Sequence, residues 1–382
     1  MAKDRGTGLK EIFQKAYTLG IFSVLSSHLS KAQKKVFEAI RQCRTINMGG
    51  HVDKCIICNH THISYNSCRD RHCPLCGGLS KERWLSRMLG MVLDVQHLHM
   101  VFTVPQELNR IALANKPLFY NLLFKASRDA VMEYCTSRDF TPGFTSVLHS
   151  WGQNLSFHPH IHLVITAGGL SSNGKWVRRM DKKGRAYLAP VRVLSRLFRG
   201  KLVSMLRAAH SEGRLVFDAK AFSSILSDAM EKEWCVYSKE PFHGSQCVYK
   251  YLGRYTHRTA ISNSRILSLT EESVSFKWRD YSDGNKEKVM VLSIEEFIRR
   301  FLMHVLENGF TRIRHYGLYA QAAKKKRLKA AELTGTELNE ITEESTAELI
   351  MRICGIDIYT CPVCGAPLVS GSLLDYHLGR IP

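Results

Sequence analysis

Long apolar segments are missing from this sequence of 382 residues. Stretches such as residues 98–104 and 161–170 are far shorter than the roughly 20 residues that a helix needs to cross a bilayer. Residues 1–13 contain no apolar core of the kind that marks a secretory signal peptide. These absences argue against a membrane protein or a secreted one, and we expect a cytoplasmic protein.

Two further features are scarce. The chain lacks a Gly-x-x-x-x-Gly-Lys loop, whose backbone cradles the phosphates of ATP, so we expect chemistry that does not consume ATP. Acidic residues are outnumbered, because 54 Lys and Arg face 34 Asp and Glu and give a net charge of +20. Such an excess favours a polyanionic partner, most often nucleic acid, over a basic protein with merely solvated charged faces.

Patterns along the chain suggest three parts. Residues 1–95 combine helical periodicity with a segment rich in Cys and His, and residues 96–320 mix strands with helices. Residues 321–382 contain a basic linker followed by a Cys-containing tail. Within the middle part, residues 144–152 and 160–168 are two strand-like runs joined by a short polar connection, which predicts an antiparallel hairpin.

Cysteine is abundant, with twelve residues. Because a reducing compartment disfavours disulfides, we expect the clustered cysteines to bind metal. Two Cys-x-x-Cys pairs lie close together, and their spacing predicts one four-thiolate zinc site. Its ligands would be Cys55, Cys58, Cys73 and Cys76. The alternatives for any one ligand are Cys68, His60, His62 and His72.

This zinc site has two interpretations that the sequence does not separate. The neighbouring Arg69 and Arg71 would suit contact with DNA, whereas a purely structural zinc explains the cysteines equally well. A further pair, Cys361 and Cys364, is a candidate for a second zinc site, with two reduced structural cysteines as the alternative. The residues that could complete that second site are Cys354 and His377.

Residues 157–169 carry the most informative pattern in the chain. Side chains alternate between the two faces of a strand, so His160 and His162 project to the same side. Two imidazoles about 7 Å apart along one strand can chelate a single divalent ion. His149 on the preceding strand could meet them across the hairpin, whereas His158 is expected in the connecting turn.

Two or three histidine ligands leave coordination positions open, as a catalytic ion requires. The nitrogen donors by themselves favour Zn, Mn, Fe or Ni over Mg. A lone His-x-His pattern is also common among core and surface histidines, so its meaning depends on the residues that accompany it.

Tyr251 and Tyr255 lie four residues apart, which places both hydroxyls on one face of a helix. Arg254 and Arg258 add positive charge beside them, as for contact with DNA. A packed aromatic stripe is the simpler explanation, but a tyrosine oxygen can also attack a phosphodiester and form a covalent phosphotyrosine. Since the free pKa of tyrosine is about 10, a metal would have to hold the phosphate and stabilise the transition state.

Together these parts resemble the rolling-circle, two-tyrosine insertion-sequence transposases of the IS-ninety-one type, within the HUH endonuclease superfamily. The resembling segments are residues 55–60 with 67–76, then 148–169, 251–266 and 309–318. The Cys-rich segment is similar to that family's zinc-binding domain. His160 and His162 match its metal-binding pair, and Tyr251 and Tyr255 match its two nucleophiles.

The resemblance implies an α+β fold in which a small helical and zinc-binding domain precedes an HUH nuclease domain, a central antiparallel sheet flanked by helices. It implies a bacterial enzyme of the nucleoid that nicks single-stranded DNA at element ends through a 5′-phosphotyrosine and a free 3′-hydroxyl. Zn²⁺ would be structural, and Mg²⁺ or Mn²⁺ catalytic. The alternatives are a plasmid replication initiator or relaxase, and a non-catalytic zinc-dependent DNA-binding regulator.

Overall fold

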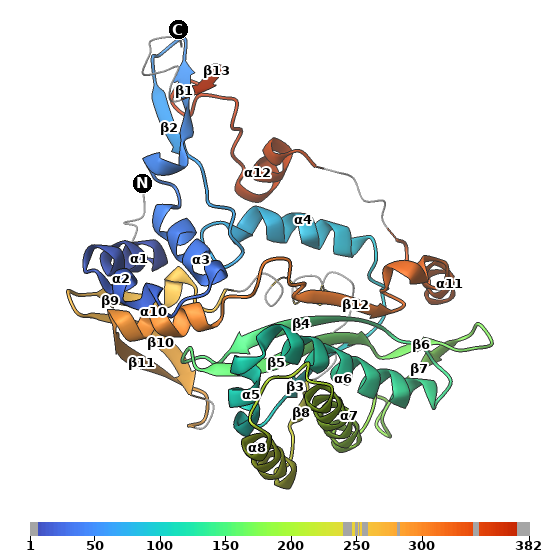
Figure 1. The fold of residues 1–382 in the computed structure, drawn as a ribbon. Coiled ribbons are helices and arrows are strands. Elements are labelled where there is room, and N and C mark those ends of the chain that lie inside the picture. Colours follow the sequence, from blue (N-terminus) through green and yellow to red (C-terminus); the bar gives the residue numbers. More distant parts are fainter. Residues whose placement is uncertain are drawn as a thin grey trace.

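The structure is a computed structural model that describes residues 7–239, 247–248, 251, 253, 259–280, 283–338 and 344–372. Helices and antiparallel sheets make up its ordered elements, which confirms the expected α+β class (Figure 1). Among the described residues, no helix is both long and apolar enough to cross a membrane.

A five-stranded antiparallel sheet forms the centre of the molecule (Figure 1). Its strands, in spatial order, are β12 (Ile313–Gly317), β4 (Gly143–Trp151), β5 (Phe157–Thr166), β3 (His97–Thr103) and β8 (Val236–Ser238). Strands β4 and β5 form the predicted hairpin, with His149 opposite His160 and Val147 opposite His162. Strand β5 therefore lies in the middle of the sheet, paired on both edges.

Helices cover one face of this sheet. They are α5 (Asn109–Ala114), α6 (Lys116–Thr136), α7 (Val191–Ser211) and α8 (Ala219–Glu231), and Figure 1 shows them together on one side. Burial alternates strictly at the start of β5, where Phe157 and Ile161 enter the core beneath the helices. The intervening histidines therefore face the opposite side, as strand geometry requires.

A second core joins the beginning of the described chain to a later region. Its elements are α1 (Leu9–Thr18), α2 (Ile21–Ser26), α3 (Lys31–Gln42), α10 (Ile294–Met303), and the sheet of β9 (Ile266–Leu269), β10 (Ser273–Asp280) and β11 (Lys286–Ser293). The ring of Phe13 lies 4.9 Å from that of Phe37 and 5.3 Å from that of Phe301. These contacts join residues on both sides of the domain boundary predicted at residue 95. The division of the chain into three parts stays a prediction.

The remaining elements lie around these two cores (Figure 1). They are β1 (Gly50–Cys55), β2 (Thr61–Tyr65), α4 (Gly77–Leu89), β6 (Gly168–Leu170), β7 (Trp176–Arg178), α11 (Lys324–Thr334), α12 (Thr346–Cys354) and β13 (Leu368–Ser372). Short 3-10 turns occupy Ile46–Met48, Gln106–Leu108, Asn263–Arg265 and Gln321–Ala323. Strand β13 pairs with β1, so the cysteine-rich N-terminal region and the last described residues contribute to one small sheet.

Replacing Phe13 by Ala should lower the free energy of unfolding by about 3–5 kcal/mol, because it leaves a cavity between rings from α1, α3 and α10. Val24→Ala is the matched control, since Val24 is 69% exposed and its loss should cost at most about 0.5 kcal/mol. Denaturant titration followed by circular dichroism measures both. Equal stabilities of the two variants would contradict the shared core.

Candidate active site and zinc centres

Three histidines meet on the face of the sheet opposite the helices. His149, His160 and His162 each offer one ring nitrogen, and these atoms all lie within 4.8 Å of one another. The Nε2 atoms of His160 and His162 are 3.0 Å apart. The structure thus brings together the three residues that the sequence analysis predicted as metal ligands, and their role in binding stays a prediction.

The other ring nitrogens of the two β5 histidines have partners of their own. His160 Nδ1 lies 2.7 Å from the backbone oxygen of His158, and His162 Nδ1 lies 2.9 Å from Nε2 of His99. Contacts of this kind fix the orientation and tautomer of an imidazole and leave Nε2 available as a ligand. The donor set therefore fits a divalent ion bound through nitrogen, with positions left for oxygen.

His99 on β3 is a site residue that the sequence analysis missed. Its Nδ1 lies 2.7 Å from the hydroxyl oxygen of Tyr251, so it connects that tyrosine to His162. Burial lowers the pKa of His99 to about 3, with a further contribution from the charge of Lys239, so the ring is neutral at pH 7. The His-x-His pattern of residues 97–99 was visible, but only strand pairing shows which ring faces the site.

Tyr251 reaches the histidine face from the same side as α4. It packs against the apolar cluster formed by Met88, Val92, Val164 and Val248. Its helical conformation agrees with the predicted helix. The other predicted residues of this segment, Tyr255, Arg254 and Arg258, lie outside the described residues, so their roles stay predictions.

The expected turn position of His158 was wrong. Strand β5 begins at Phe157, and the ring of His158 lies 5.3 Å from that of His160 on the same face. The strand tolerates Pro159 because the β4–β5 register shifts between His149 and Trp151, where a missing N–H costs little. His158 remains outside the group of clustered ring nitrogens.

A cavity of about 800 Å³ opens in front of the histidines. Its walls come from the central sheet, the end of β8 and strand β10. The side chains that line it include the cations Lys239, Arg265 and Arg279 and the aromatics Trp151, Tyr237 and Trp278. Trp151 stacks on His149 with ring centroids 4.6 Å apart, so it supports a candidate ligand as well. A cavity of this composition suits an anionic chain with flat rings.

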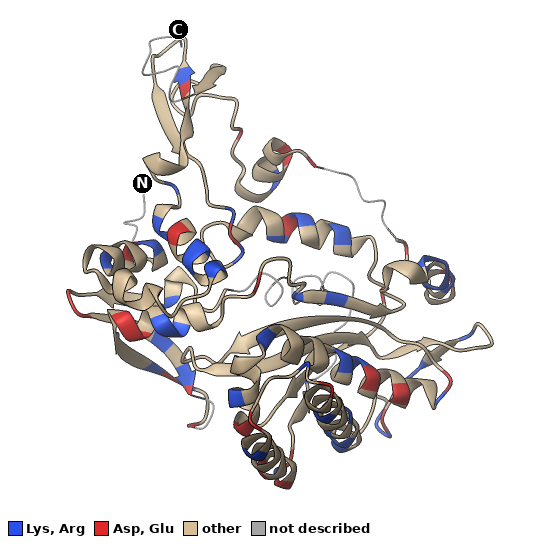
Figure 2. Ribbon diagram, viewed as in Figure 1, with Lys and Arg blue, Asp and Glu red and all other residues tan. Residues whose placement is uncertain are grey.

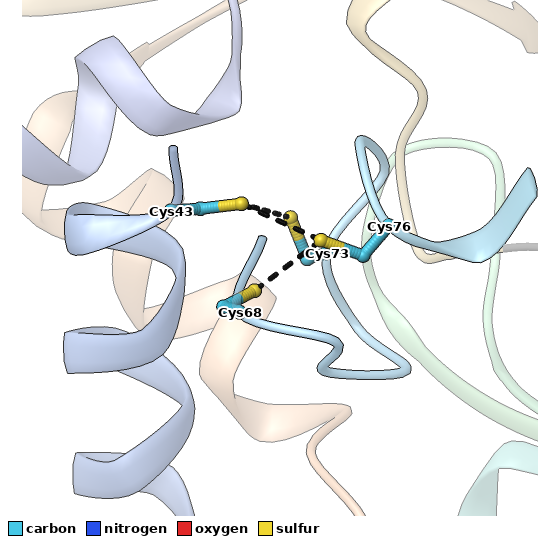
Figure 3. A group of neighbouring side chains, drawn as sticks. All are labelled: Cys43, Cys68, Cys73 and Cys76. Atoms are coloured by element: carbon cyan, nitrogen blue, oxygen red, sulfur yellow. Dashed lines mark hydrogen bonds between the residues drawn. The ribbon is translucent and has the colours of Figure 1, made fainter. Parts of the chain in front are cut away.

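The cysteines form two groups, which corrects the single zinc site predicted from sequence. The first group contains Cys43, Cys68, Cys73 and Cys76 (Figure 3). The second group contains Cys55, Cys58, Cys361 and Cys364. The two Cys-x-x-Cys pairs were assigned to one ion because they are close in sequence, but the β1–β2 hairpin carries Cys55 and Cys58 away from the other pair.

The first group has the dimensions of a four-thiolate zinc site. Its sulfur atoms are 3.4 Å apart between Cys43 and Cys76 and 3.5 Å apart between Cys68 and Cys76. A tetrahedron with Zn–S bonds of about 2.3 Å has edges of about 3.8 Å, so the thiols need to move little. The Cys68 and Cys73 thiols hold the pKa of Cys76 well below its usual value. Cys76 also occupies the position directly before the first residue of α4, so this group lies at the start of that helix.

Apart from Cys68, the alternative zinc ligands considered from the sequence lie outside the two cysteine groups wherever the structure describes them. His72 has Nδ1 2.9 Å from Asp70 and accepts the Leu306 N–H at Nε2, so both its nitrogens are used in the fold. Cys354 is the last residue of α12 and belongs to neither cysteine group. His60 and His62, in the β1–β2 hairpin, also lie outside both groups. His377, the other candidate for the second site, lies outside the described residues.

The two arginines of the cysteine-rich segment that were predicted to contact DNA have different surroundings. The guanidinium of Arg71 donates to the backbone oxygens of Phe310, at 2.7 Å, and Glu307, at 2.8 Å. This arginine therefore has a structural role that the sequence did not indicate. Arg69 is exposed, and a contact with DNA stays a prediction for it. Figure 2 shows further Lys and Arg positions along α4 and α11.

Comparisons with known proteins agree with this architecture. Residues 143–327 match the family model described as "Putative transposase", and residues 12–104 match the "Transposase zinc-binding domain". The chain is 40% identical over 353 residues to the "Putative transposase y4qJ" of Sinorhizobium fredii, with 88% of each protein covered. It is 27% identical over 320 residues to the "Transposase for insertion sequence element IS801" of Pseudomonas savastanoi pv. phaseolicola, with 82% of this chain and 76% of that protein covered. No solved structure matches.

The matched regions define a class of transposases in which a zinc-binding domain precedes the part that contains the clustered histidines and Tyr251. The chain belongs to this family, the insertion-sequence transposases of the IS-ninety-one type, as the resemblance implied. The matched zinc-binding domain and the two cysteine groups together indicate structural zinc.

Metal binding should fall in a graded order across the histidines. His160→Ala and His162→Ala should abolish Mn²⁺ binding, because each removes a ligand, whereas His99→Ala should weaken it about 10–100-fold by releasing the ring of His162. His158→Ala, on the same strand face, is the control and should bind Mn²⁺ normally. Isothermal titration calorimetry measures the affinities.

Binding to DNA should survive in all four variants, since it rests on many phosphate contacts. Mn²⁺ affinity unchanged by the loss of His160 or His162 would exclude the proposed ligand set.

Proposed function

We propose that this transposase cuts and joins single-stranded DNA through a covalent bond between Tyr251 and a 5′-phosphate. The observation that carries the proposal is the line of contacts from the Tyr251 hydroxyl through His99 to His162. It couples a potential nucleophile to the group of histidines best suited to hold a divalent ion. An ordinary core tyrosine would need no such connection.

In the proposed step, the hydroxyl of Tyr251 releases its proton to water, and the phenolic oxygen bonds to the phosphorus of a phosphodiester. The bond from phosphorus to the 3′ oxygen of the preceding nucleotide breaks, which leaves a free 3′-hydroxyl after protonation and keeps the bond energy in the phosphotyrosine. A divalent ion held by His149, His160 and His162 would polarise the phosphate and offset its growing charge. We propose Mg²⁺ or Mn²⁺, since phosphate and water oxygens would complete the shell.

The tautomers of the histidines support activation of the tyrosine. When His162 uses Nε2 as a ligand, its single proton is on Nδ1, and this N–H donates to Nε2 of His99. The neutral ring of His99 then carries its own proton on Nδ1, which faces the Tyr251 oxygen at 2.7 Å. A donated hydrogen bond stabilises the phenolate form over the phenol. His99 would thus help Tyr251 to attack without removing its proton.

The lining of the cavity supports single-stranded DNA as the substrate. Lys239 and Arg279 offer positive charge to a phosphate backbone, and Trp278 and Tyr237 offer faces on which unpaired bases can stack. A single strand can splay a phosphodiester against the histidines more easily than a stiff duplex can. We therefore propose that single-stranded or hairpin ends are cut in preference to linear duplex, without ATP.

The second tyrosine of the family pattern would serve a second strand. Residues four apart on a helix lie about 6 Å from each other, so two hydroxyls cannot occupy one attacking position. Tyr251 contacts His99, which favours it for the first cut. Tyr255 would then accept the second strand, so that the enzyme holds two DNA ends in succession.

The helix α4 would hold the nucleophile in place. A Cβ atom added to Gly253 would lie 2.9 Å from Leu85 Cδ1 and 3.0 Å from Lys81 Cε, so a side chain at this position would force Leu85 and Lys81 to shift. Since α4 begins at Gly77, directly after the zinc-site residue Cys76, the position of Tyr251 would depend on the zinc-binding module. In this proposal the module positions the tyrosine in addition to any contact with DNA.

Incubation with single-stranded element ends and Mn²⁺ should yield a covalent adduct on a denaturing gel, and mass spectrometry should place it on Tyr251 or Tyr255. Single Tyr→Phe changes should leave some nicking, whereas the double change should remove the adduct because no phenolic nucleophile remains. Metal and DNA binding should persist in the double variant and serve as its control. An adduct that survives in the double variant, or none with wild type, would refute the mechanism; the latter result would favour a non-catalytic regulator.

Gly253→Ala should slow adduct formation about fivefold or more, because overpacking against Leu85 costs about 1–3 kcal/mol and displaces the tyrosine. Leu85→Ala in the same chain should restore part of the rate by making room for the added methyl group. Single-turnover cleavage at saturating DNA measures this change. A double variant slower than the product of the two single effects would argue against a steric contact at this point.

A further inference from the structure

We propose that Cys55, Cys58, Cys361 and Cys364 bind a second zinc ion that joins the C-terminal segment to the N-terminal module. Their four sulfur atoms lie within 4.8 Å of one another. Cys55 and Cys364 are 3.4 Å apart, and Cys58 and Cys361 are 3.6 Å apart. These separations match the edges of about 3.8 Å in a tetrahedral zinc–thiolate site and greatly exceed the roughly 2.0 Å of a disulfide.

The two Cys-x-x-Cys turns have the same backbone structure. Cys55 N–H donates to the oxygen of His60, and Asn59 N–H donates back to the oxygen of Cys55. The C-terminal turn repeats this pattern between Cys361 and Ala366 and between Gly365 and Cys361. The residue after the second cysteine is left-handed in both turns, with φ of 58° at Asn59 and 73° at Gly365. Two equivalent turns that face each other make a closed four-ligand site.

Strand pairing brings the two turns together. Strand β13 follows the C-terminal turn and pairs with β1, with Leu368 opposite Cys55. The hydroxyl of Ser370 donates to the carboxylate of Asp53 beside this pairing. The ligands Cys58 and Cys361 are nevertheless 303 residues apart in sequence. The zinc would therefore close a loop that spans most of the 382-residue chain.

The C-terminal segment has little else to hold it. Among residues 344–372, only Leu349 and Cys361 are buried. Apolar side chains such as Tyr359 and Val363 remain 65% and 68% exposed. Burial on this scale cannot offset the conformational entropy lost by ordering such a segment. A structural zinc contributes folding free energy directly, so it can supply what the missing core does not.

The second zinc would also complete the module around α4. Helix α12 precedes the C-terminal turn and contacts α4, where Arg83 donates to the Thr346 hydroxyl at 2.6 Å. The matched zinc-binding domain ends at residue 104 and so contains only two of the four ligands of this site. The module would then be assembled from both ends of the chain, with one zinc entirely within the N-terminal part and one shared.

Zinc content of the full-length chain tests this assignment. The histidine site is first removed by His160→Ala with His162→Ala, so that only thiolate zinc remains in protein purified without added metal. This background should hold about two zinc ions per chain, one for each cysteine group. Cys361→Ser with Cys364→Ser should lower the value to about one. Cys354→Ser is the matched control, because this nearby exposed cysteine belongs to neither group, and it should retain both ions.

Combined variants distinguish the shared site from the grouping suggested by sequence. Adding Cys55→Ser and Cys58→Ser to the C-terminal pair should remove no further zinc, whereas adding Cys73→Ser and Cys76→Ser should remove the last ion. Two zinc ions retained without Cys361 and Cys364 would overturn the proposal. A further loss of zinc when Cys55→Ser and Cys58→Ser are added would also overturn it.

Limited proteolysis with mass spectrometry provides a second readout that does not depend on activity. Loss of the C-terminal cysteines should speed cleavage within residues 344–372 and leave the rate unchanged within the central sheet. Equal resistance of the segment with and without these cysteines would show that zinc does not hold it. Because neither measurement involves cutting DNA, failure here would leave the proposed nuclease function untouched, and failure of that function would leave this zinc site untouched.

Discussion

Alternation of side chains along β5 is the constraint on which the site depends. Ile161 must fill the core beneath the helices, so His160 and His162 must face the other side. A slip of one residue would bury both histidines and expose the core, which is why the register is strongly fixed. Pairing with β4 then sets His149 opposite His160, and pairing with β3 brings His99 against His162. Core packing and the geometry of the histidines therefore have one cause.

The proposed nucleophile comes to this face from a different part of the molecule. Tyr251 packs on α4, and α4 starts at Gly77, directly after Cys76 of the first cysteine group. The two interpretations of the zinc module given by sequence, DNA contact and structural support, are therefore not equal in the structure. The guanidinium of Arg71 is hydrogen-bonded to backbone oxygens. The clearest connection of the module to the site is the packing of α4 against Tyr251. Arg69 remains available to test the other interpretation.

Local patterns were enough for part of this architecture. Period-two alternation predicted the β4–β5 hairpin and the common face of His160 and His162, because both features depend on neighbours in sequence. His99 was missed because its role depends on which strand pairs with β5. The cysteine grouping was wrong because Cys-x-x-Cys spacing identifies a pair of ligands but does not identify the second pair. Cys43 and Cys361 join their groups only through contacts distant in sequence.

Those distant contacts impose a further consequence. The N-terminal part of the chain is held to later parts at several places, among them the contact of Phe13 with Phe301 and the pairing of β1 with β13. Tyr251 and most of the central sheet lie between these contacts in the sequence. Loop closure over such lengths adds little entropic cost per added residue, so the main requirement is that each contact be strong. An aromatic core meets that requirement at the first place, and four thiolates around one zinc would meet it at the second, where apolar burial is almost absent.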